Sequence, residues 1–309
     1  LVFDGDSFVM DARGEVVYAI PELKQPPEGS GWDVIVDSSA SALFVDRARD
    51  AGIELAENEE EAAAIASLCR LVAGLPLAIE LVAARLSTLS LAELVSEVRD
   101  GLEGYGELRG TSERHQTMES TVRWSFELLD DSAQDLLAGL SVFVGGFTLD
   151  AARYISGSAA GGTETVSRDL QELVECSMVD RRGADGRYIL LDPIRLFARD
   201  RLVESGRIDA VRAAHARAFH TIVVSAMRDL ARSDRPAVYD GLDAEAANIR
   251  ATLEWFAETG DWRDVCSLTS ALAWYWHDRR RFEDSRRWAE FCRPHLDEAD
   301  AWESAAIAC

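Results

Sequence analysis

The chain of 309 residues contains a single lysine, Lys24, and glutamine follows it. A phosphate-binding loop ends in Gly-Lys-Ser/Thr, because the lysine ammonium must reach the β- and γ-phosphates while the hydroxyl holds magnesium. No Gly-Lys pair occurs anywhere in the sequence. This absence excludes a phosphate loop of that kind, so we do not expect the chain to be an ATPase by itself.

Other features that the sequence lacks exclude further classes of protein. The sequence has neither a His-Glu-x-x-His metal motif nor a Gly-x-Ser-x-Gly nucleophile motif, so no enzyme active site emerges. Its five cysteines are odd in number and include no Cys-x-x-Cys pair, which indicates reduced thiols and a cytoplasmic protein. No run of about 18 apolar residues predicts a membrane span. The net charge of −23 gives a surface that repels nucleic acid and anionic lipid.

The first 36 residues have a mixed pattern. Leu1–Met10 and Glu15–Ile20 predict two short strands, and the prolines and glycines between residues 21 and 31 predict a loop. Two strands alone are marginally stable, so residues 1–36 are expected to be a strand remnant. The chain begins without methionine and ends inside a helical pattern, and both ends therefore look cut.

Residues 37–110 have helical periodicity. Asn58 predicts the capped start of a helix that ends at Gly74, and Pro76 opens the next helix. Ser90–Glu93 is a capping-box pattern that predicts the start of a further helix. The glycine cluster from Gly101 to Gly110 predicts a linker, which ends this helical domain.

Residues 111–206 have the element order of a winged helix. Three short helices between residues 116 and 156 break at Asp130-Asp131 and Gly145-Gly146, and a fourth helix covers Thr163–Cys176. A β-hairpin and a helix from residue 193 to 204 follow. The hairpin strands are Met178–Arg182 and Arg187–Leu191.

Residues 207–309 predict pairs of amphipathic helices. Leu268–Cys292 is the clearest pair, with a break at Asp278–Arg281. Its aromatic side chains are expected to fill the space between stacked helices rather than to form a cofactor site or a peptide groove. These are Trp274, Trp276, Phe282, Trp288 and Phe291. The predicted fold class is therefore mainly α, with a helical domain, a winged helix that carries a short β-hairpin, and incomplete helical repeats.

Several motifs carry a resemblance to a known family. Gly74-Leu75-Pro76-Leu77-Ala78-Ile79-Glu80-Leu81 resembles the GLPL motif of the NB-ARC/AP-ATPase branch of the STAND nucleotide-binding regulators. Further matches follow in the family's order: Ala83-Ala84-Arg85-Leu86, Arg114-His115-Gln116-Thr117, Thr121–Ser125, Ser141–Thr148 and Tyr188–Arg195. From about Ser38 to Phe291, the chain is similar to the ATPase and winged-helix portions of large actinobacterial LuxR-type and AfsR-type regulators.

The resemblance implies a nucleotide site to which this chain contributes only one side. Gly74, Leu75 and Pro76 would lie on the adenine side, with Pro76 packed near the base. The site would take ATP or ADP with Mg²⁺ in the intact protein. The phosphate loop would belong to a missing amino-terminal half, so no cofactor is expected for this chain alone. From the residues alone, a Gly-x-Pro junction is more often a plain helix boundary.

The winged helix of this family usually closes on the nucleotide through a Met-His-Asp triplet. The matching triplet here is Leu190-Leu191-Asp192. Leu191 occupies the sensor position but cannot donate a hydrogen bond, which argues against phosphate sensing there. Asp192 is expected to act as a structural cap before Pro193.

The two ends of the chain carry weaker resemblances. Ala273, Trp276, Phe282, Ser285 and Ala289 have tetratricopeptide-like spacing, with serine at position 285 where alanine is usual. Such repeats imply a protein or small-ligand effector as a partner. Residues 2–8 look like a strand pair from the nitrilase-like domain of glutamine-dependent NAD synthetases, and an amidase fused upstream would need its catalytic Cys, Lys and Glu there.

DNA contact by the winged helix is the sharper alternative to a structural role. Met178–Arg207 carries seven positive and five negative charges, but the candidate recognition helix, Thr163–Cys176, has Arg168 as its one base against four acids. A DNA backbone would repel such a helix. We therefore expect the winged helix to be an interdomain clamp, with DNA bound only through a domain outside this chain.

The sequence thus predicts part of a nucleotide-switched signal-transduction and transcriptional regulator. Its helical and winged-helix units would gate an ATP/ADP site, and its repeats would receive the effector. The alternative is a helical scaffold for protein–protein interaction that no longer uses nucleotide. A phosphate loop in the upstream reading frame would favour the nucleotide-switched regulator over the scaffold.

Overall fold

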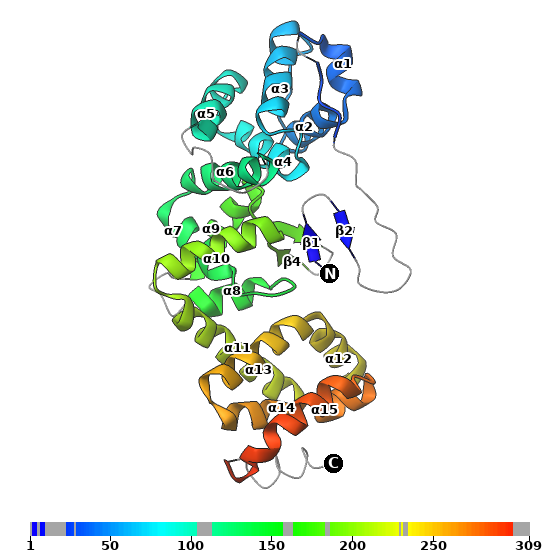
Figure 1. Ribbon diagram of the computed structural model, residues 1–309, viewed down its shortest axis with the longest axis vertical. Helices are drawn as coiled ribbons and strands as arrows, with labels where there is room; N and C mark the ends of the chain where they lie inside the picture. The colour runs from blue at the N-terminus through cyan, green and yellow to red at the C-terminus, as the bar shows by residue number, and fades with distance from the viewer. Residues whose placement is uncertain are drawn as a thin grey trace. The chain divides into compact units, whose positions relative to one another are not determined.

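The computed structural model describes residues 2–4, 7–9, 23–27, 29–103, 113–156, 163–182, 186–228, 230 and 234–298. The chain divides into two compact units. The amino-terminal unit consists of Leu1–Gln134, Gln171–Val179 and Asp192–Phe197. The carboxyl-terminal unit consists of Asp135–Leu170, Asp180–Leu191 and Ala198–Cys309. The predicted mainly helical class with a winged helix is confirmed (Figure 1).

Six helices and a short 3-10 turn account for most of the amino-terminal unit. They are α1 (Trp32–Asp37), α2 (Ser39–Asp50), α3 (Glu59–Leu71), α4 (Pro76–Ala84), η1 (Arg85–Ser87), α5 (Leu91–Glu103) and α6 (Glu113–Glu127). Helix α2 packs on α4, α3 packs on α5, and α4 and α5 both pack on α6 (Figure 1). Phe44, Ile65 and Ile79 are among the fully buried side chains of the shared apolar core.

The helix starts of this unit follow the local sequence. Asn58 caps α3, because its side-chain oxygen accepts a hydrogen bond from the Glu61 amide at 2.8 Å. Ser90 and Glu93 form the predicted capping box, with the Ser90 amide donating to the Glu93 carboxylate at 2.9 Å. Pro76 is the first residue of α4, where its missing N–H costs no helical hydrogen bond.

Two predictions for this unit need correction. Leu1–Met10 is not one strand, because β1 (Val2–Asp4) and β2 (Ser7–Val9) pair antiparallel within it. The second predicted strand, Glu15–Ile20, lies outside the described residues. Gly101 belongs to α5 rather than to a linker. A Cβ at Gly101 would lie 2.5 Å from Cδ1 of Trp124, so glycine allows α5 to approach α6 closely. The rest of that glycine cluster, 104–110, also lies outside the described residues.

The winged-helix segment has the predicted order of elements. These are α7 (Asp131–Leu140), α8 (Leu149–Ser156), α9 (Thr163–Glu175), β3 (Asp180–Arg182), β4 (Arg187–Ile189) and α10 (Asp192–Glu204). In the wing, β3 and β4 pair antiparallel with Arg181 opposite Tyr188. Tyr188 also exchanges two backbone hydrogen bonds with Phe147, both 2.9 Å long. The wing is thereby fixed to the loop that precedes α8.

The carboxyl-terminal unit continues with packed helices. They are α11 (Ile208–Arg228), α12 (Arg235–Ala244), α13 (Ala246–Thr259), α14 (Trp262–Asp278), α15 (Phe282–Cys292) and the 3-10 helix η3 (Arg293–Glu298). Helix α11 packs on α8, α13 and α14, and α14 packs on α15. The predicted break at Asp278–Arg281 is confirmed, because α14 ends and α15 begins there.

The predicted aromatic core between these helices is correct for two of its five members. Trp276 and Trp288 are buried, whereas Trp274, Phe282 and Phe291 are 63%, 55% and 40% exposed. Residues 274 and 276 are two apart on one helix and so project about 200° apart, which prevents both from facing the same core. The sequence pattern did not distinguish the buried face of α14 from its exposed face.

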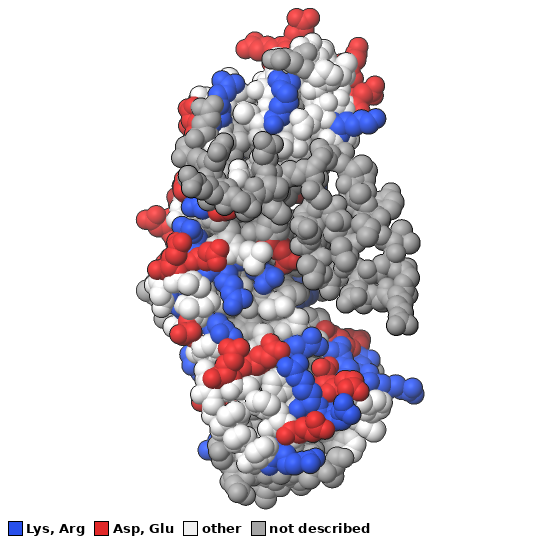
Figure 2. Space-filling view, in the orientation of Figure 1, with Lys and Arg blue, Asp and Glu red and all other residues white. Residues whose placement is uncertain are grey.

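Charged side chains are interspersed over the surface, and arginine and aspartate gather over α12, α14 and α15 (Figure 2). Arg281 contacts Asp243 at 2.6 Å, and Arg235 contacts Asp278 at 3.2 Å.

Within the part of the chain that the structure describes, no helix is long and apolar enough to cross a membrane. The same residues include no group of three or more His, Cys, Asp or Glu side chains placed to hold a metal ion.

Candidate functional sites

The Gly74-Leu75-Pro76 junction links α3 to α4 through two residues in the left-handed region. Ala73 has a φ of +53° and Gly74 a φ of +65°, and the Gly74 amide donates to the Cys69 carbonyl at 2.8 Å. Gly74 is buried and Leu75 is half-buried, while Pro76 is exposed. The junction therefore presents the rigid edge of Pro76 outward over a closely packed backbone.

The segment Leu23–Pro27, here called the strap, covers Gly74. A Cβ on Gly74 would meet the Gln25 side chain at 3.0 Å and the Leu23 carbonyl oxygen at 3.1 Å, so this close approach requires glycine. The strap is tied to the start of α2, because the Lys24 amide donates to Ser39 Oγ at 2.7 Å and the Lys24 carbonyl accepts from the Ala40 amide at 3.0 Å. The side chain of Lys24 itself is exposed.

A buried arginine lies at the end of α4. Arg85 is 5% exposed and donates a hydrogen bond to the backbone carbonyl of Ser125 in α6. It also lies beside Cys176, at the end of α9. Burial lowers the pKa of the Arg85 guanidinium and raises the pKa of the Cys176 thiol. The arginine of the Ala83-Ala84-Arg85-Leu86 match is thus a buried structural link, a role that its sequence pattern did not reveal.

Leu191 and Asp192 stand at the start of α10. Leu191 takes the N-cap position, and the helix begins at Asp192, so the prediction that Asp192 caps this helix is wrong by one residue. Among the described residues, no side chain forms a capping hydrogen bond at the start of this helix. The Asp192 carboxylate instead pairs with Arg195 at 2.9 Å within the first helical turn, where the helix dipole favours a negative charge.

A buried asparagine joins the winged helix to the helices that follow it. Asn248 of α13 is fully buried and uses both atoms of its amide. Its Oδ1 accepts from the Val144 amide at 2.8 Å and lies 3.4 Å from Nε2 of His215. Its Nδ2 donates to the Gly146 carbonyl at 2.9 Å and to the Glu245 carboxylate at 2.8 Å. The four bonds fill the hydrogen-bonding capacity of the amide. We call this arrangement the Asn248 centre.

The wing takes part in the same network. Arg187 of β4 forms an ion pair with Glu245, and both side chains are largely buried. Gly146 has a φ of +100°, and a Cβ there would lie 2.8 Å from the Tyr188 carbonyl oxygen. The loop can therefore reach both Tyr188 and Asn248 because it has no side chain at this position.

Aromatic packing surrounds the Asn248 centre. His215 packs against Phe143 and Phe219, with ring centroids 5.2 and 4.6 Å apart, and Phe143 stacks on Phe147. Burial lowers the pKa of His215 to about 4, so its imidazole is neutral near pH 7. Sequence patterns did not assign a role to Asn248 or Glu245; a polar residue on the apolar face of α13 was the available signal.

The candidate recognition helix α9 has little positive charge to offer DNA. Glu164, Arg168, Gln171 and Glu175 are exposed along it, at helical spacing. Arg168 pairs with the buried Asp169 at 2.8 Å. The wing arginine that could reach a phosphate from β4, Arg187, is already paired with Glu245. The exposed face of α9 therefore carries a net negative charge.

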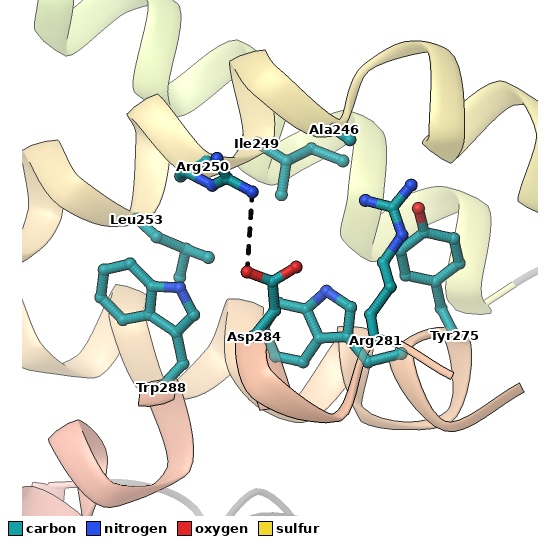
Figure 3. Close-up of a pocket in the computed structure, with 9 residues that line it drawn as sticks. Ala246, Ile249, Arg250, Leu253, Tyr275, Arg281, Asp284 and Trp288 are labelled. Carbon is teal, nitrogen blue, oxygen red and sulfur yellow. Dashed lines mark ion pairs between the residues drawn. The ribbon is translucent and has the colours of Figure 1, made fainter. Parts of the chain in front are cut away.

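A small pocket lies among α13, α14 and α15 (Figure 3). Arg250 of α13 and Asp284 of α15 face each other across it at 3.6 Å (Figure 3). Apolar and aromatic side chains line the rest, together with Arg281: Ala246, Ile249, Leu253, Tyr275, Trp276 and Trp288. We call this the Arg250 pocket.

Residues 129–203 match the family described as a winged helix-turn-helix domain. This segment is therefore a winged-helix domain, in agreement with the order of α7 to α10. Over 282 residues the chain is 30% identical to putative HTH-type transcriptional regulators of Mycobacterium bovis and Mycobacterium tuberculosis, which covers 89% of the chain and 30% of each regulator.

The chain also resembles uncharacterized proteins of the same two species. The identity is 36% over 208 residues, which is 65% of this chain and 50% of those proteins. The chain thus spans about a third of the length of the regulators it matches and half that of the uncharacterized proteins.

Proposed function

We propose that this chain is the gating part of a transcriptional regulator that switches with bound nucleotide. Its similarity to putative HTH-type transcriptional regulators supports the regulatory role. The GLPL-like junction supports the nucleotide, because Pro76 offers an exposed, rigid apolar edge against which an adenine ring could pack. The phosphate loop and Mg²⁺ site would belong to a polypeptide segment outside these residues, and the chain would catalyse no reaction itself.

In this proposal the winged helix acts as an interdomain clamp. The observation that carries it is the Asn248 centre, which connects the wing and the Gly145-Gly146 loop to α11 and α13 by buried and half-buried polar contacts. A movement of the winged helix would therefore be transmitted directly to the carboxyl-terminal helices. These helices would be tetratricopeptide-like repeats that receive the effector, in the cytoplasm, where the buried free cysteines stay reduced.

The second candidate is DNA binding by this winged helix, which the description of the matched family favours. The acidic exposed face of α9 and the engagement of Arg187 with Glu245 argue against it. The third candidate, a scaffold that no longer uses nucleotide, would keep the clamp but lose the role of Pro76.

Two binding measurements test the proposal. Thermal unfolding with and without millimolar Mg-ATP or Mg-ADP should show no shift for this chain, because it lacks the phosphate loop. A saturable shift would place a complete nucleotide site within these residues. It would contradict the expectation that the phosphate loop belongs to another segment. In a polypeptide extended upstream in the reading frame, the same nucleotides should raise stability by about 2.7 kcal/mol at a hundredfold excess over the dissociation constant. No shift in the extended chain would favour the scaffold.

Fluorescence anisotropy with a labelled DNA duplex tests the clamp against direct DNA contact. At about 50 mM salt, where non-specific phosphate contacts are strongest, the chain should not bind the duplex. Binding that is lost in Arg181→Gln, on the exposed wing strand, but kept in the control Arg217→Gln on α11 would overturn the clamp and support the second candidate.

A further inference from the structure

Two buried cysteines lie together in the hairpin of α14 and α15. Cys266 of α14 and Cys292, the last residue of α15, are 0% and 1% exposed, and their thiols are hydrogen-bonded to each other. The Cys292 thiol also donates to Oγ1 of Thr269 at 3.5 Å. Because Thr269 follows Cys266 by three residues, the two share one face of α14, and Cys292 packs against that face.

The course of the two helices brings these cysteines to the same height in the hairpin. Helix α14 ends at Asp278 and α15 begins at Phe282, so a short turn reverses the chain. Measured from this turn, Cys266 lies about 18 Å along α14 and Cys292 about 15 Å along α15. The Cβ atoms of bonded cysteines are about 3.5–4.5 Å apart, and two thiols in hydrogen-bond contact are near that spacing.

The buried cysteines of the amino-terminal unit have different neighbours. Arg85 is hydrogen-bonded to Cys176, and Arg70 is the charged residue that acts on Cys69. All four of these described cysteines are free thiols. Among them, Cys266 and Cys292 are therefore the pair that the fold places in position for a covalent bond.

We propose that Cys266 and Cys292 form a reversible disulfide when the protein meets a peroxide, so that α14 becomes cross-linked to α15. The Cys292 sulfur, as its thiolate, attacks a peroxide oxygen; the O–O bond breaks, and Cys292 becomes a sulfenic acid as the first water is released. The Cys266 sulfur then attacks the Cys292 sulfur and displaces a second water. Two thiols lose two electrons and two protons to hydrogen peroxide, which becomes two water molecules.

The burial of the pair determines how fast it can react. Burial raises the pKa of the Cys292 thiol, so little thiolate is present near pH 7, and neither sulfur is open to solvent. Oxidation therefore requires a local opening, which costs least at the end of a helix, where Cys292 lies. We expect the pair to remain reduced during brief exposure to peroxide and to be oxidised during sustained exposure.

The cross-link would add control by oxidants to the helices that are proposed to receive the effector. Helices α14 and α15 also contribute Trp276 and Trp288 to the Arg250 pocket, so the bond would fix two of its walls relative to each other. The disulfide requires neither nucleotide binding nor the regulatory role.

Peptide mapping by mass spectrometry tests the pairing. The reduced, folded chain is treated with millimolar hydrogen peroxide, the remaining thiols are blocked with N-ethylmaleimide, and the chain is digested. Linked peptides that contain Cys266 and Cys292 should be the dominant disulfide product. In the chain unfolded with urea, the same treatment should give mixed pairs, because the fold no longer selects partners. Mixed pairs in the folded chain, or no disulfide within it, would overturn the proposal.

Variants and thermal unfolding test the cross-link itself. Cys266→Ala and Cys292→Ala should each lose the linked peptides, whereas the matched control Cys176→Ala, at another buried cysteine, should keep them. Circular dichroism verifies that each variant is folded. The oxidised protein should unfold about 5–10 °C above the reduced protein, because the bond closes a loop of about 25 residues. Dithiothreitol should reverse this gain.

No gain on oxidation, or an equal gain in Cys292→Ala, would contradict a cross-link between the two helices. The mapping of the unmodified chain decides the pairing even if an alanine variant fails to fold. These outcomes leave the proposed function untouched, since the nucleotide shift in the extended chain decides it separately.

Discussion

One buried polar site from each unit illustrates two ways in which this protein buries polar groups. In the amino-terminal unit, the Arg85 Nε, the Trp124 indole nitrogen and the Ser125 hydroxyl are buried and have no hydrogen-bond partner among the described residues. In the carboxyl-terminal unit, Asn248 is fully buried and uses all four of its hydrogen-bonding positions. Around Arg85, the contact of α4 with α6 therefore depends mainly on apolar packing, whereas directional bonds align the Asn248 centre.

This difference indicates how each of the two sites tolerates substitutions. Apolar packing is non-directional, so a core such as that of α2 to α6 accepts substitutions of similar volume at small cost. A saturated polar network permits one arrangement, because any displacement leaves several buried groups unpaired. The geometry of the Asn248 centre is therefore more strictly specified than that of the apolar core of α2 to α6.

The largest effect is expected from Asn248→Leu, a change of similar volume. It leaves the buried Gly146 carbonyl and the half-buried Val144 amide without partners, and should lower the free energy of unfolding of the carboxyl-terminal unit by about 3–5 kcal/mol. Denaturant titration followed by hydrogen exchange of the β4 amides measures it. Arg85→Met is the comparison in the other unit and should cost about 1 kcal/mol. Equal losses would remove the contrast between the Arg85 site and the Asn248 centre.

The second-largest loss of stability is expected at low pH, where His215 of the Asn248 centre becomes protonated. His215 has its pKa lowered from an ordinary value of 6.5 to about 4, because burial disfavours the imidazolium. The neutral form therefore contributes stability that is fully present above pH 6.5 and is lost as the pH falls from 6.5 to 4. The loss should reach about 3 kcal/mol at pH 4. Unfolding titrations over this range measure it, and His215→Gln should flatten the profile; an unchanged profile would refute the assignment to His215.

The smallest losses of stability are expected from two alanine substitutions at glycines with a positive φ, which form a matched pair. Gly146 and Gly206 both have a positive φ, but a Cβ at Gly146 would lie 2.8 Å from the Tyr188 carbonyl oxygen. A Cβ at Gly206 would have no described atom within 4 Å. Gly206→Ala should cost about 1 kcal/mol for backbone strain alone, and Gly146→Ala about 2–3 kcal/mol because the loop must also move. Equal losses in thermal unfolding would mean that the close contact with the wing contributes nothing.

The sequence predicted much of the fold, because local signals determine helix ends. The Asn58 cap, the Ser90–Glu93 capping box and the break before Phe282 were each predicted from neighbouring residues and are present. The winged-helix order followed from the spacing of glycines and of the hairpin. The role of Gly101 was missed, because its partner, Trp124, lies on another helix and no local pattern connects them.

In the candidate sites too, local sequence predicted some features, whereas contacts between distant residues were missed. The Gly74 junction was located from its motif, but the strap that covers it was not, since the Gln25 contact joins residues far apart in the chain. The Asn248 centre depends on groups from a loop, a wing and two helices. A bonding network of this kind is visible only after the helices have been placed, so the residues gave no sequence signal beyond a polar side chain at an apolar position.

The strap has a practical consequence for labelling. Lys24 is the one lysine of the chain, its side chain is exposed, and its backbone is hydrogen-bonded to α2 beside Gly74. Apart from the amino end of the chain, an amine-reactive dye therefore has a single side chain to modify. A fluorophore placed there would sit next to the GLPL-like junction and report on local events at that edge. The same amine would attach the protein to a surface in one orientation.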